Sequence, residues 1–133
     1  MDNKYGRQTI PSVQKPANIL QKYWGSITTV YGDENFALKK IFMKKGTQSS
    51  MEYHIKKEET YYIYSGKLKL GLRVGRAENK FIILEKNDIY HIPVGLMHMR
   101  MALEDTVIIE WSNGDDDEDS NIVEDGKKYK FPL

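Results

Sequence analysis

Alternating polarity in short segments points this chain towards β-structure. Between residues 67 and 74, leucine and valine side chains alternate with lysine, glycine and arginine. Because successive side chains of a strand point to opposite faces, this pattern predicts a strand with one buried and one polar face. Other runs are rich in the β-branched and aromatic residues that favour strands, and they occupy residues 60–64, 81–84 and 106–111. No segment shows helical periodicity over the length that a helix needs, so we expect an all-β protein.

Turn-forming residues separate these segments at regular intervals. Glycine, proline, asparagine and aspartate gather where a chain can reverse direction, at residues 32–33, 45–46, 65–66, 75–79, 86–88, 93–95 and 104–105. Strands of roughly five to eight residues with a turn every eight to twelve or so predict a sandwich or barrel. The chain has 133 residues, enough for one domain with a core and too few for two of ordinary size.

The ends of the chain differ from its middle. Residues 1–22 are mostly polar, and Pro11 and Pro16 interrupt any helix there. We predict an arm over residues 1–22, with one short strand, a domain over residues 23–126 and a surface tail over residues 127–133.

Composition excludes several classes of function. Cysteine is absent, so disulfides, thiolate zinc sites and a cysteine nucleophile are excluded. The net charge is +1, which does not indicate binding to nucleic acid or to an anionic membrane. The first residues lack the apolar core of a signal peptide, and no apolar run approaches the length of a membrane span. We therefore expect a soluble cytoplasmic protein whose partner is a small molecule.

Four residues have the chemistry and spacing of metal ligands. Glu52 and His54 are two residues apart, so on a strand they point to the same face. Glu59 starts the next expected strand, and His98 lies in a second segment punctuated by proline and glycine. This mixed oxygen and nitrogen set suits a divalent ion such as Zn, Mn, Fe, Ni or Co. The alternative is two ordinary histidines, with glutamates solvating strand ends.

The acidic segment 113–121 allows two interpretations. Asp115, Asp117 and Asp119 alternate as in a calcium loop, but the glycine, the bidentate glutamate and the flanking helices of an EF-hand are missing. We expect a flexible, solvated loop.

The two ligand-bearing segments resemble the paired motifs of the cupin superfamily, which are small double-stranded β-helix (jelly-roll) proteins that bind a metal inside the barrel. The matching residues are those that turn the chain or would bind metal, namely Gly46, His54, Glu59, Gly66, Pro93, Gly95 and His98. Glu52 stands in place of the usual first histidine, Asn87 in place of a glycine and Ala102 in place of an asparagine.

Over roughly residues 15–126 the chain is most similar to the C-terminal cupin domain of type II mannose-6-phosphate isomerases. The resemblance is carried by residues 24–26, 40–46, 87–98, 109–110, 114–116 and 122–123. Three positions depart from that family: Glu52 replaces a glutamine, Met99 a basic residue, and Glu124 an arginine. These changes weaken the likeness in phosphate recognition more than in metal binding.

The resemblance implies an isomerase that moves a proton between adjacent carbons of a sugar, with a divalent ion and a general base. As base we consider Glu110, which shares a strand face with Ile108, and His91, whose face is undecided. For Glu110 an outward-pointing carboxylate is equally compatible with the pattern, and for His91 a partly buried structural role is favoured. Arg100 lies two residues from His98, and we expect it either to bind a substrate anion or to pair with Glu52, Glu59 or Glu110. Lys45 and Tyr62 are further substrate-binding candidates, although the lysines near residues 44–45 and 56–57 are more typical of a solvated rim. Met97, Met99 and Met101 are expected in a core or interface.

Three functions follow from this pattern. The chain is a metal-dependent isomerase of a sugar or sugar phosphate, a non-catalytic cupin that binds a carbohydrate or small acid, or a metal-free nucleotide-sugar isomerase or epimerase. The apolar residues Ile10 and Val13 ahead of the barrel also predict a homodimer, in which the arm covers a sheet edge.

Overall fold

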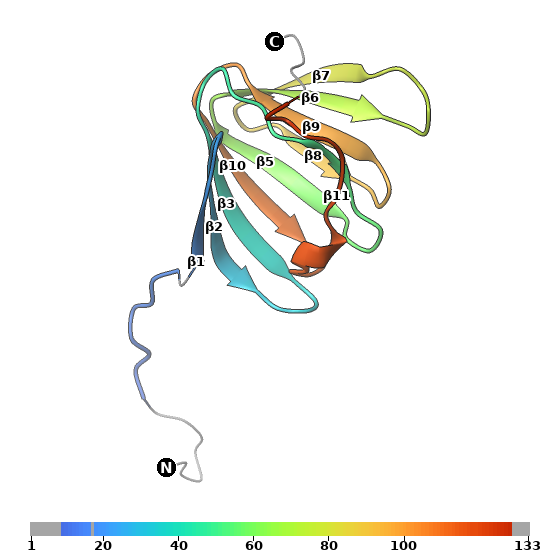
Figure 1. The fold of residues 1–133 in the computed structure, drawn as a ribbon. Helices are drawn as coiled ribbons and strands as arrows, with labels where there is room; N and C mark the ends of the chain where they lie inside the picture. The colour runs from blue at the N-terminus through green and yellow to red at the C-terminus, as the bar shows by residue number, and fades with distance from the viewer. Residues whose placement is uncertain (1–8, 17, 129–133) are drawn as a thin grey trace.

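The computed structural model describes residues 9–16 and 18–128 and shows two antiparallel sheets that face each other around a central space (Figure 1). The first sheet has six strands in the order β1-β2-β3-β10-β5-β8. They are β1 (Asn18–Lys22), β2 (Gly25–Gly32), β3 (Ala37–Met43), β10 (Thr106–Ser112), β5 (Glu59–Ser65) and β8 (Ile89–Ile92).

The second sheet has five strands in the order β11-β4-β9-β6-β7. They are β11 (Asn121–Glu124), β4 (Met51–Tyr53), β9 (Met97–Ala102), β6 (Lys67–Arg73) and β7 (Lys80–Glu85). One short 3-10 helix, η1 (Asp117–Asp119), precedes β11. From β3 onward the chain passes repeatedly from one sheet to the other, so residues far apart in the sequence meet in the space between the sheets.

The alternation predicted for residues 67–74 places Leu68 and Leu70 in the core, where both are fully buried. Leu72 packs against the same core, whereas Val74 lies beyond the end of β6 and is exposed. The sequence did not decide which face of β8 points to the core. In the structure Ile92 is buried and Ile89 is exposed, so the face that carries Ile92 is the inner one. His91 shares the outer face with Ile89.

Strand β9 is buried on both faces. One face carries His98 and Arg100 towards the central space, and the other carries Met99 and Met101 into a small cluster with Met51. The methionines are therefore core residues, as their chemistry predicts, and packing on both sides holds β9 in place beneath the polar side chains it presents.

Two glycines of the first motif have positive φ angles but different surroundings. Gly46 has φ +83° with open space where a Cβ would stand, whereas Gly66 has φ +92° and its Cβ would lie 2.3 Å from the Asp105 carbonyl oxygen. We expect Gly46→Ala to lower the free energy of unfolding by about 1 kcal/mol, from the strained backbone alone. Gly66→Ala should cost about 3 kcal/mol or more, because a steric clash adds to the strain. Urea denaturation of both variants checks this, and equal losses would contradict it.

The N-terminal segment before β1 leads away from the barrel (Figure 1). Its residues Ile10 and Val13 are 95% and 89% exposed, and β1 forms an edge of its sheet. The homodimer suggested by this arm stays a prediction. In the part of the chain that the structure describes, no helix has the length and apolar character needed to cross a membrane.

Candidate metal centre and adjoining cavity

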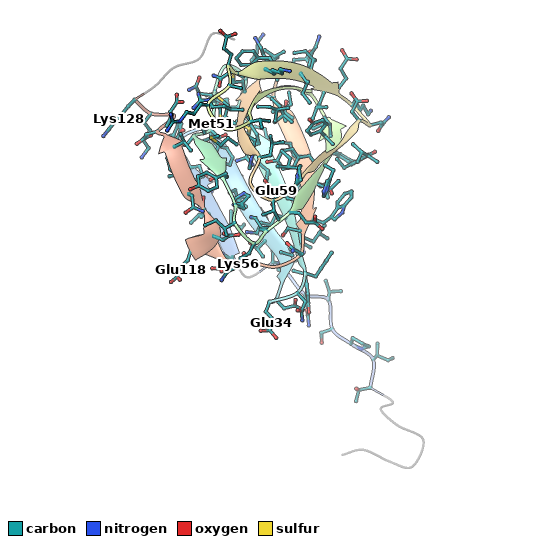
Figure 2. The ribbon with its side chains drawn as sticks, turned by 90° about the vertical axis from the view of Figure 1, so that its right-hand side faces the viewer. Glu34, Met51, Lys56, Glu59, Glu118 and Lys128 are labelled. Atoms are coloured by element: carbon teal, nitrogen blue, oxygen red, sulfur yellow. The ribbon has the colours of Figure 1, made fainter. Side chains whose placement is uncertain are left out.

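The four predicted ligand residues come from three strands that the fold brings together. Glu52 lies on β4 and pairs directly with His98 on β9 across the sheet. His54 follows one residue after β4, and Glu59 is the first residue of β5 in the opposite sheet. Figure 2 shows Glu59 in the interior of the barrel, far from the rim residues Glu34 and Glu118. Strand pairing therefore fixes one half of the cluster, and sheet packing adds the other.

The side chains of this cluster converge on one point. Ligand atoms of Glu52, His54 and His98 all lie within 4.8 Å of one another. Glu59 Oε1 lies 3.4 Å from His54 Nε2 and 2.9 Å from His98 Nε2. His54, His98 and Glu59 are almost fully buried, and Glu52 is partly open to the cavity. These separations allow Glu52, His54 and His98 to reach a single small cation, and Glu59 lies directly beside both imidazoles.

Backbone carbonyls set the tautomer of both imidazoles. His54 Nδ1 lies 3.0 Å from the carbonyl oxygen of Asp119, and His98 Nδ1 lies 2.8 Å from that of Leu96. A carbonyl oxygen only accepts, so each Nδ1 carries a proton, and each Nε2 is the ring nitrogen that faces the cluster and can bind a metal ion once it is deprotonated. Neither Nε2 atom has a well-aligned hydrogen bond within residues 9–16 and 18–128, although both are buried. Two buried imidazole nitrogens that face two carboxylates fit a divalent metal ion.

The charges around the cluster keep the Glu59 carboxylate ionised. Burial raises the pKa of Glu59, but His54, His98 and Lys57 outweigh it and hold that pKa well below its usual range. Burial lowers the pKa of His54, but the Glu59 carboxylate outweighs this effect and the net pKa is raised. The cluster therefore presents an ionised carboxylate to groups that share its interior.

Asp119 corrects the expectation of a flexible acidic loop over residues 113–121. Its carboxylate accepts hydrogen bonds from the backbone N–H groups of Ile55, Lys56 and Lys57, at 2.8 to 3.0 Å. Its own carbonyl oxygen holds His54, and the neighbouring Ser120 hydroxyl donates to Glu52. Asp119 is only 6% exposed. Nothing in the sequence distinguishes it from the other aspartates, because its partners are more than sixty residues away.

We expect Asp119→Ala to lower the free energy of unfolding by about 2 kcal/mol, because three backbone donors lose a charged acceptor. Burial raises the pKa of Asp119, but the three N–H groups outweigh it and lower the net pKa. A lowered folded-state pKa stabilises the protein above the unfolded-state pKa, so this contribution is lost as the pH falls below about 4. Urea denaturation at pH 7 and pH 3 should show the gap between the parent and the variant narrowing in acid.

The exposed Glu118 provides the control for this experiment, since Glu118→Ala removes an acidic side chain from the same turn. Equal stability of the Asp119→Ala and Glu118→Ala variants would show that the carboxylate does not hold the loop.

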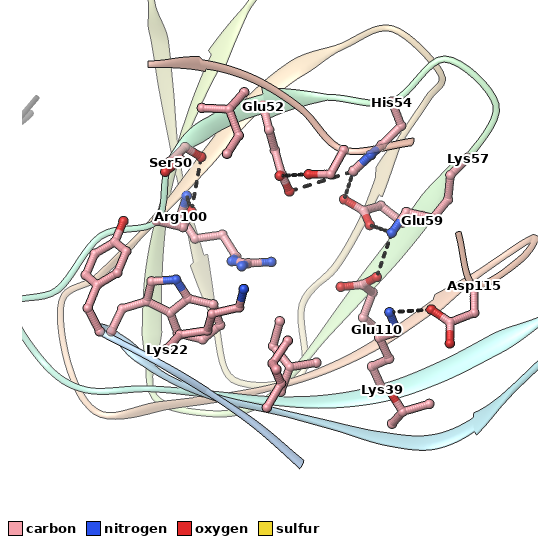
Figure 3. A pocket seen from close by; sticks show the side chains of 18 of the residues that line it. Lys22, Lys39, Ser50, Glu52, His54, Lys57, Glu59, Arg100, Glu110 and Asp115 are labelled. Carbon is pink, nitrogen blue, oxygen red and sulfur yellow. Dashed lines mark hydrogen bonds and ion pairs between the residues drawn. The ribbon is translucent and has the colours of Figure 1, made fainter. Parts of the chain in front are cut away.

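Lys57 corrects the expectation that the lysines after His54 form a solvated rim. Its Nζ lies 3.5 Å from Glu59 Oε2 and 3.9 Å from Glu110 Oε1, and its side chain is 15% exposed. Burial lowers the pKa of Lys57, but Glu110 and Glu59 outweigh it, so the net pKa is raised and the lysine keeps its charge. We call Glu52, His54, Glu59 and His98 the metal-type cluster. Lys57 connects this cluster to the carboxylate of Glu110 on β10 (Figure 3).

Glu110 faces the interior, as its shared parity with Ile108 allows, and is 4% exposed. Burial raises the pKa of Glu110 to about 8, with a further contribution from the negative charge of Glu59. Glu59 and Glu110 thus differ in character although they are neighbours: the first stays ionised, and the second exchanges a proton more readily near neutral pH.

A cavity of about 650 Å³ opens beside the cluster. Its lining includes Glu52, His54, Glu59 and Glu110 from the polar side and Trp24 and Arg100 from the opposite wall. The size lies within the range of small-molecule sites, about 300–1,000 Å³.

Three candidates from the sequence lie away from this cavity. His91 is half exposed on the outer face of β8, with Thr60 and Glu58 as its neighbours. The Tyr62 hydroxyl donates to Asn87, and the Lys45 backbone N–H donates to Asp105. None of the three lines the cavity in the described part of the chain. Their strand parity and turn position direct them outward, so the structure does not bring them to the cluster.

Comparison with known proteins bears on both fold and family. The profile of the family described as mannose-6-phosphate isomerase C-terminal matches residues 12–124. No protein with a curated description matches this chain.

Several solved structures are similar. The capsular polysaccharide assembling protein CapF from Staphylococcus aureus has a TM-score of 0.74 and 24% identity, over 84% of this chain and 32% of CapF. A variant of oxalate decarboxylase from Bacillus subtilis has a TM-score of 0.74 and 16% identity, over 91% of this chain and 35% of the decarboxylase. KdgF from Halomonas sp. has a TM-score of 0.64 and 17% identity, over 76% of this chain and 91% of KdgF. The chain thus spans about a third of the first two, and the likeness confirms the predicted all-β jelly roll.

Proposed function

This chain belongs to the cupin-type family of mannose-6-phosphate isomerase C-terminal domains, and on that premise we propose that it is a metal-dependent isomerase of a sugar or sugar phosphate. The observation that carries the proposal is the convergence of Glu52, His54 and His98 on one point. Glu59 lies against both imidazoles, and the adjoining cavity also contains Glu110 and Lys57. Family membership supports the sugar substrate, and the geometry supports the chemistry.

In this proposal His54 and His98 would hold the ion through Nε2, and Glu52 and Glu59 would hold it through carboxylate oxygens. When bound, the ion supplies positive charge that stabilises negative charge developing on the sugar oxygens. Asp119 and Ser120 keep the ligands in place through His54 and Glu52. Hydrogen-bonded support of this kind is typical of metal ligands.

Proton transfer is assigned to Glu110. Interconversion of an aldose and a ketose requires a base that removes a proton from one carbon and returns it to the adjacent carbon. Glu110 lines the cavity, and Lys57 lies 3.9 Å from its carboxylate, where it orients that group. His91, the other candidate, is on the outside of the barrel and takes no part.

The experiment is to load the purified protein with Zn, Mn, Fe, Ni or Co and to incubate it with mannose 6-phosphate and other sugar phosphates in deuterated water. Nuclear magnetic resonance then reports both the isomer ratio and deuterium incorporation at the carbon next to the carbonyl. Isomerisation with deuterium uptake in the metal-loaded protein supports the proposal. Binding without exchange would indicate a non-catalytic cupin, and equal turnover after chelation would indicate a metal-free isomerase or epimerase.

A further inference from the structure

We propose that Arg100 forms an anion-binding subsite in the wall of the cavity, which takes the carboxylate or phosphate group of an acidic sugar. The inference rests on the function proposed above and specifies its substrate class. It would make the protein selective for a charged sugar over the neutral sugar of the same stereochemistry.

Aromatic rings hold the guanidinium group of Arg100 in place. The Arg100 Cζ atom lies 5.0 Å from the centre of the Trp24 ring and 5.9 Å from that of Tyr61. Its Nη1 donates a long hydrogen bond of 3.4 Å to the Tyr61 hydroxyl, and its backbone N–H donates to Ser49 Oγ. Stacking against rings fixes the plane of a guanidinium group and leaves its N–H edge free to bind an anion.

Arg100 forms no direct ion pair within the described residues, although it is only 7% exposed and the carboxylates of Glu52, Glu59 and Glu110 attract it across the cavity. The neighbouring cations differ: Lys57 pairs with Glu59 and Glu110, and Lys39 pairs with Asp115 at 2.9 Å. Arg100 Nε is buried and has no hydrogen-bond partner in this part of the chain. The pairing with Glu52, Glu59 or Glu110 that the sequence allowed is therefore not made. A buried guanidinium group with one long hydrogen bond and no direct ion pair among the described residues keeps N–H donors for a ligand, so an anion that reaches it gains a strong interaction.

Arg100 and the metal-type cluster share one cavity. The guanidinium group points into the space between Glu52 and Glu110, and residues of both groups line that space (Figure 3). The three carboxylates on one side repel an anion, whereas Arg100 on the other side attracts it. An acidic sugar therefore enters with its charged group at Arg100 and its hydroxyl or carbonyl oxygens towards the cluster.

The test measures dissociation constants of the metal-loaded full chain for mannose 6-phosphate, glucuronate, mannose and glucose. Trp111 lies on the outer face of β10 and does not line the cavity, so Trp111→Phe leaves Trp24 as the single tryptophan reporter next to Arg100. We expect either mannose 6-phosphate to bind more tightly than mannose or glucuronate to bind more tightly than glucose, with a change in Trp24 fluorescence. The pair that shows the difference identifies the preferred anionic group as phosphate or carboxylate. Arg100→Gln should weaken that binding by at least about 30-fold and leave the neutral sugar unchanged.

Two further variants control the result. Lys127→Gln removes an exposed positive charge from the same cavity lining and should change the affinity less than about threefold, as for a rim charge. Arg100→Lys keeps the charge and should retain part of the preference for the acidic sugar. The metal content of each variant, measured alongside, should equal that of the parent.

The subsite is contradicted if neither acidic sugar is preferred by the parent protein, or if the preference persists in folded Arg100→Gln. The affinities of the parent protein test the subsite without any substitution, so the proposal can be contradicted even if Arg100→Gln does not fold. A preference for an acidic sugar without isomerisation would contradict the proposed isomerase activity and support the subsite. Isomerisation at the same rate in the parent and in Arg100→Gln would support the isomerase activity and contradict the subsite.

Discussion

His98→Ala is expected to lower metal affinity by more than about 100-fold and to abolish metal-dependent turnover, while the protein stays folded. The imidazole supplies a buried Nε2 that faces the cluster, 2.9 Å from Glu59 Oε1. Losing it removes one of only two nitrogen ligands and leaves Glu52 and Glu59 to hold the ion with His54. Equilibrium dialysis with metal analysis gives the affinity, and circular dichroism gives the fold.

The matched control is His91→Ala, since His91 is a half-exposed histidine on the outer face of the neighbouring sheet. It should bind metal as the parent does. Equal metal affinity of the His98→Ala and His91→Ala variants would show that the four-residue cluster is not the site of metal binding.

Glu110→Gln should reduce turnover by about 100-fold to 10,000-fold, the range that a general acid or base contributes. Glutamine is nearly the same size and keeps hydrogen-bonding capacity, but it cannot take up a proton. Because Glu110 is not among the expected ligands, metal content should be unchanged, which separates this effect from that of His98→Ala. Steady-state kinetics on the active sugar phosphate, together with metal analysis, tests both statements.

The exposed Glu104, in the turn before β10, offers the corresponding control as Glu104→Gln. A Glu110→Gln variant with the turnover of Glu104→Gln would remove Glu110 from the reaction and leave proton transfer without an assigned residue.

The fold could be predicted from the sequence because its signals are local. Alternation in residues 67–74 and the turns at glycine and proline describe each strand without reference to its neighbours. The metal-type cluster was also predictable, since Glu52 and His54 share a strand face and the two segments resemble a known pair of motifs. The structure adds the contact between Glu52 and His98 across β4 and β9.

The residues that sequence reasoning missed depend on tertiary contacts. Lys57 has the same local sequence context as its neighbour Lys56, yet it points inward between Glu59 and Glu110 while Lys56 is exposed. Asp119 was hidden in an acidic run whose composition indicates solvation. Strand parity alone left His91 undecided, because Ile89 and Ile92 gave two equally apolar faces. The cytoplasmic location and the homodimer stay predictions.

Anomalous X-ray scattering from crystals of the metal-loaded protein tests the central claim most directly. The account predicts one strong peak at the metal absorption edge, within bonding distance of Nε2 of His54 and His98 and of carboxylate oxygens of Glu52 and Glu59. A peak elsewhere, or none at this point after the crystals have been soaked in the ion, would contradict it.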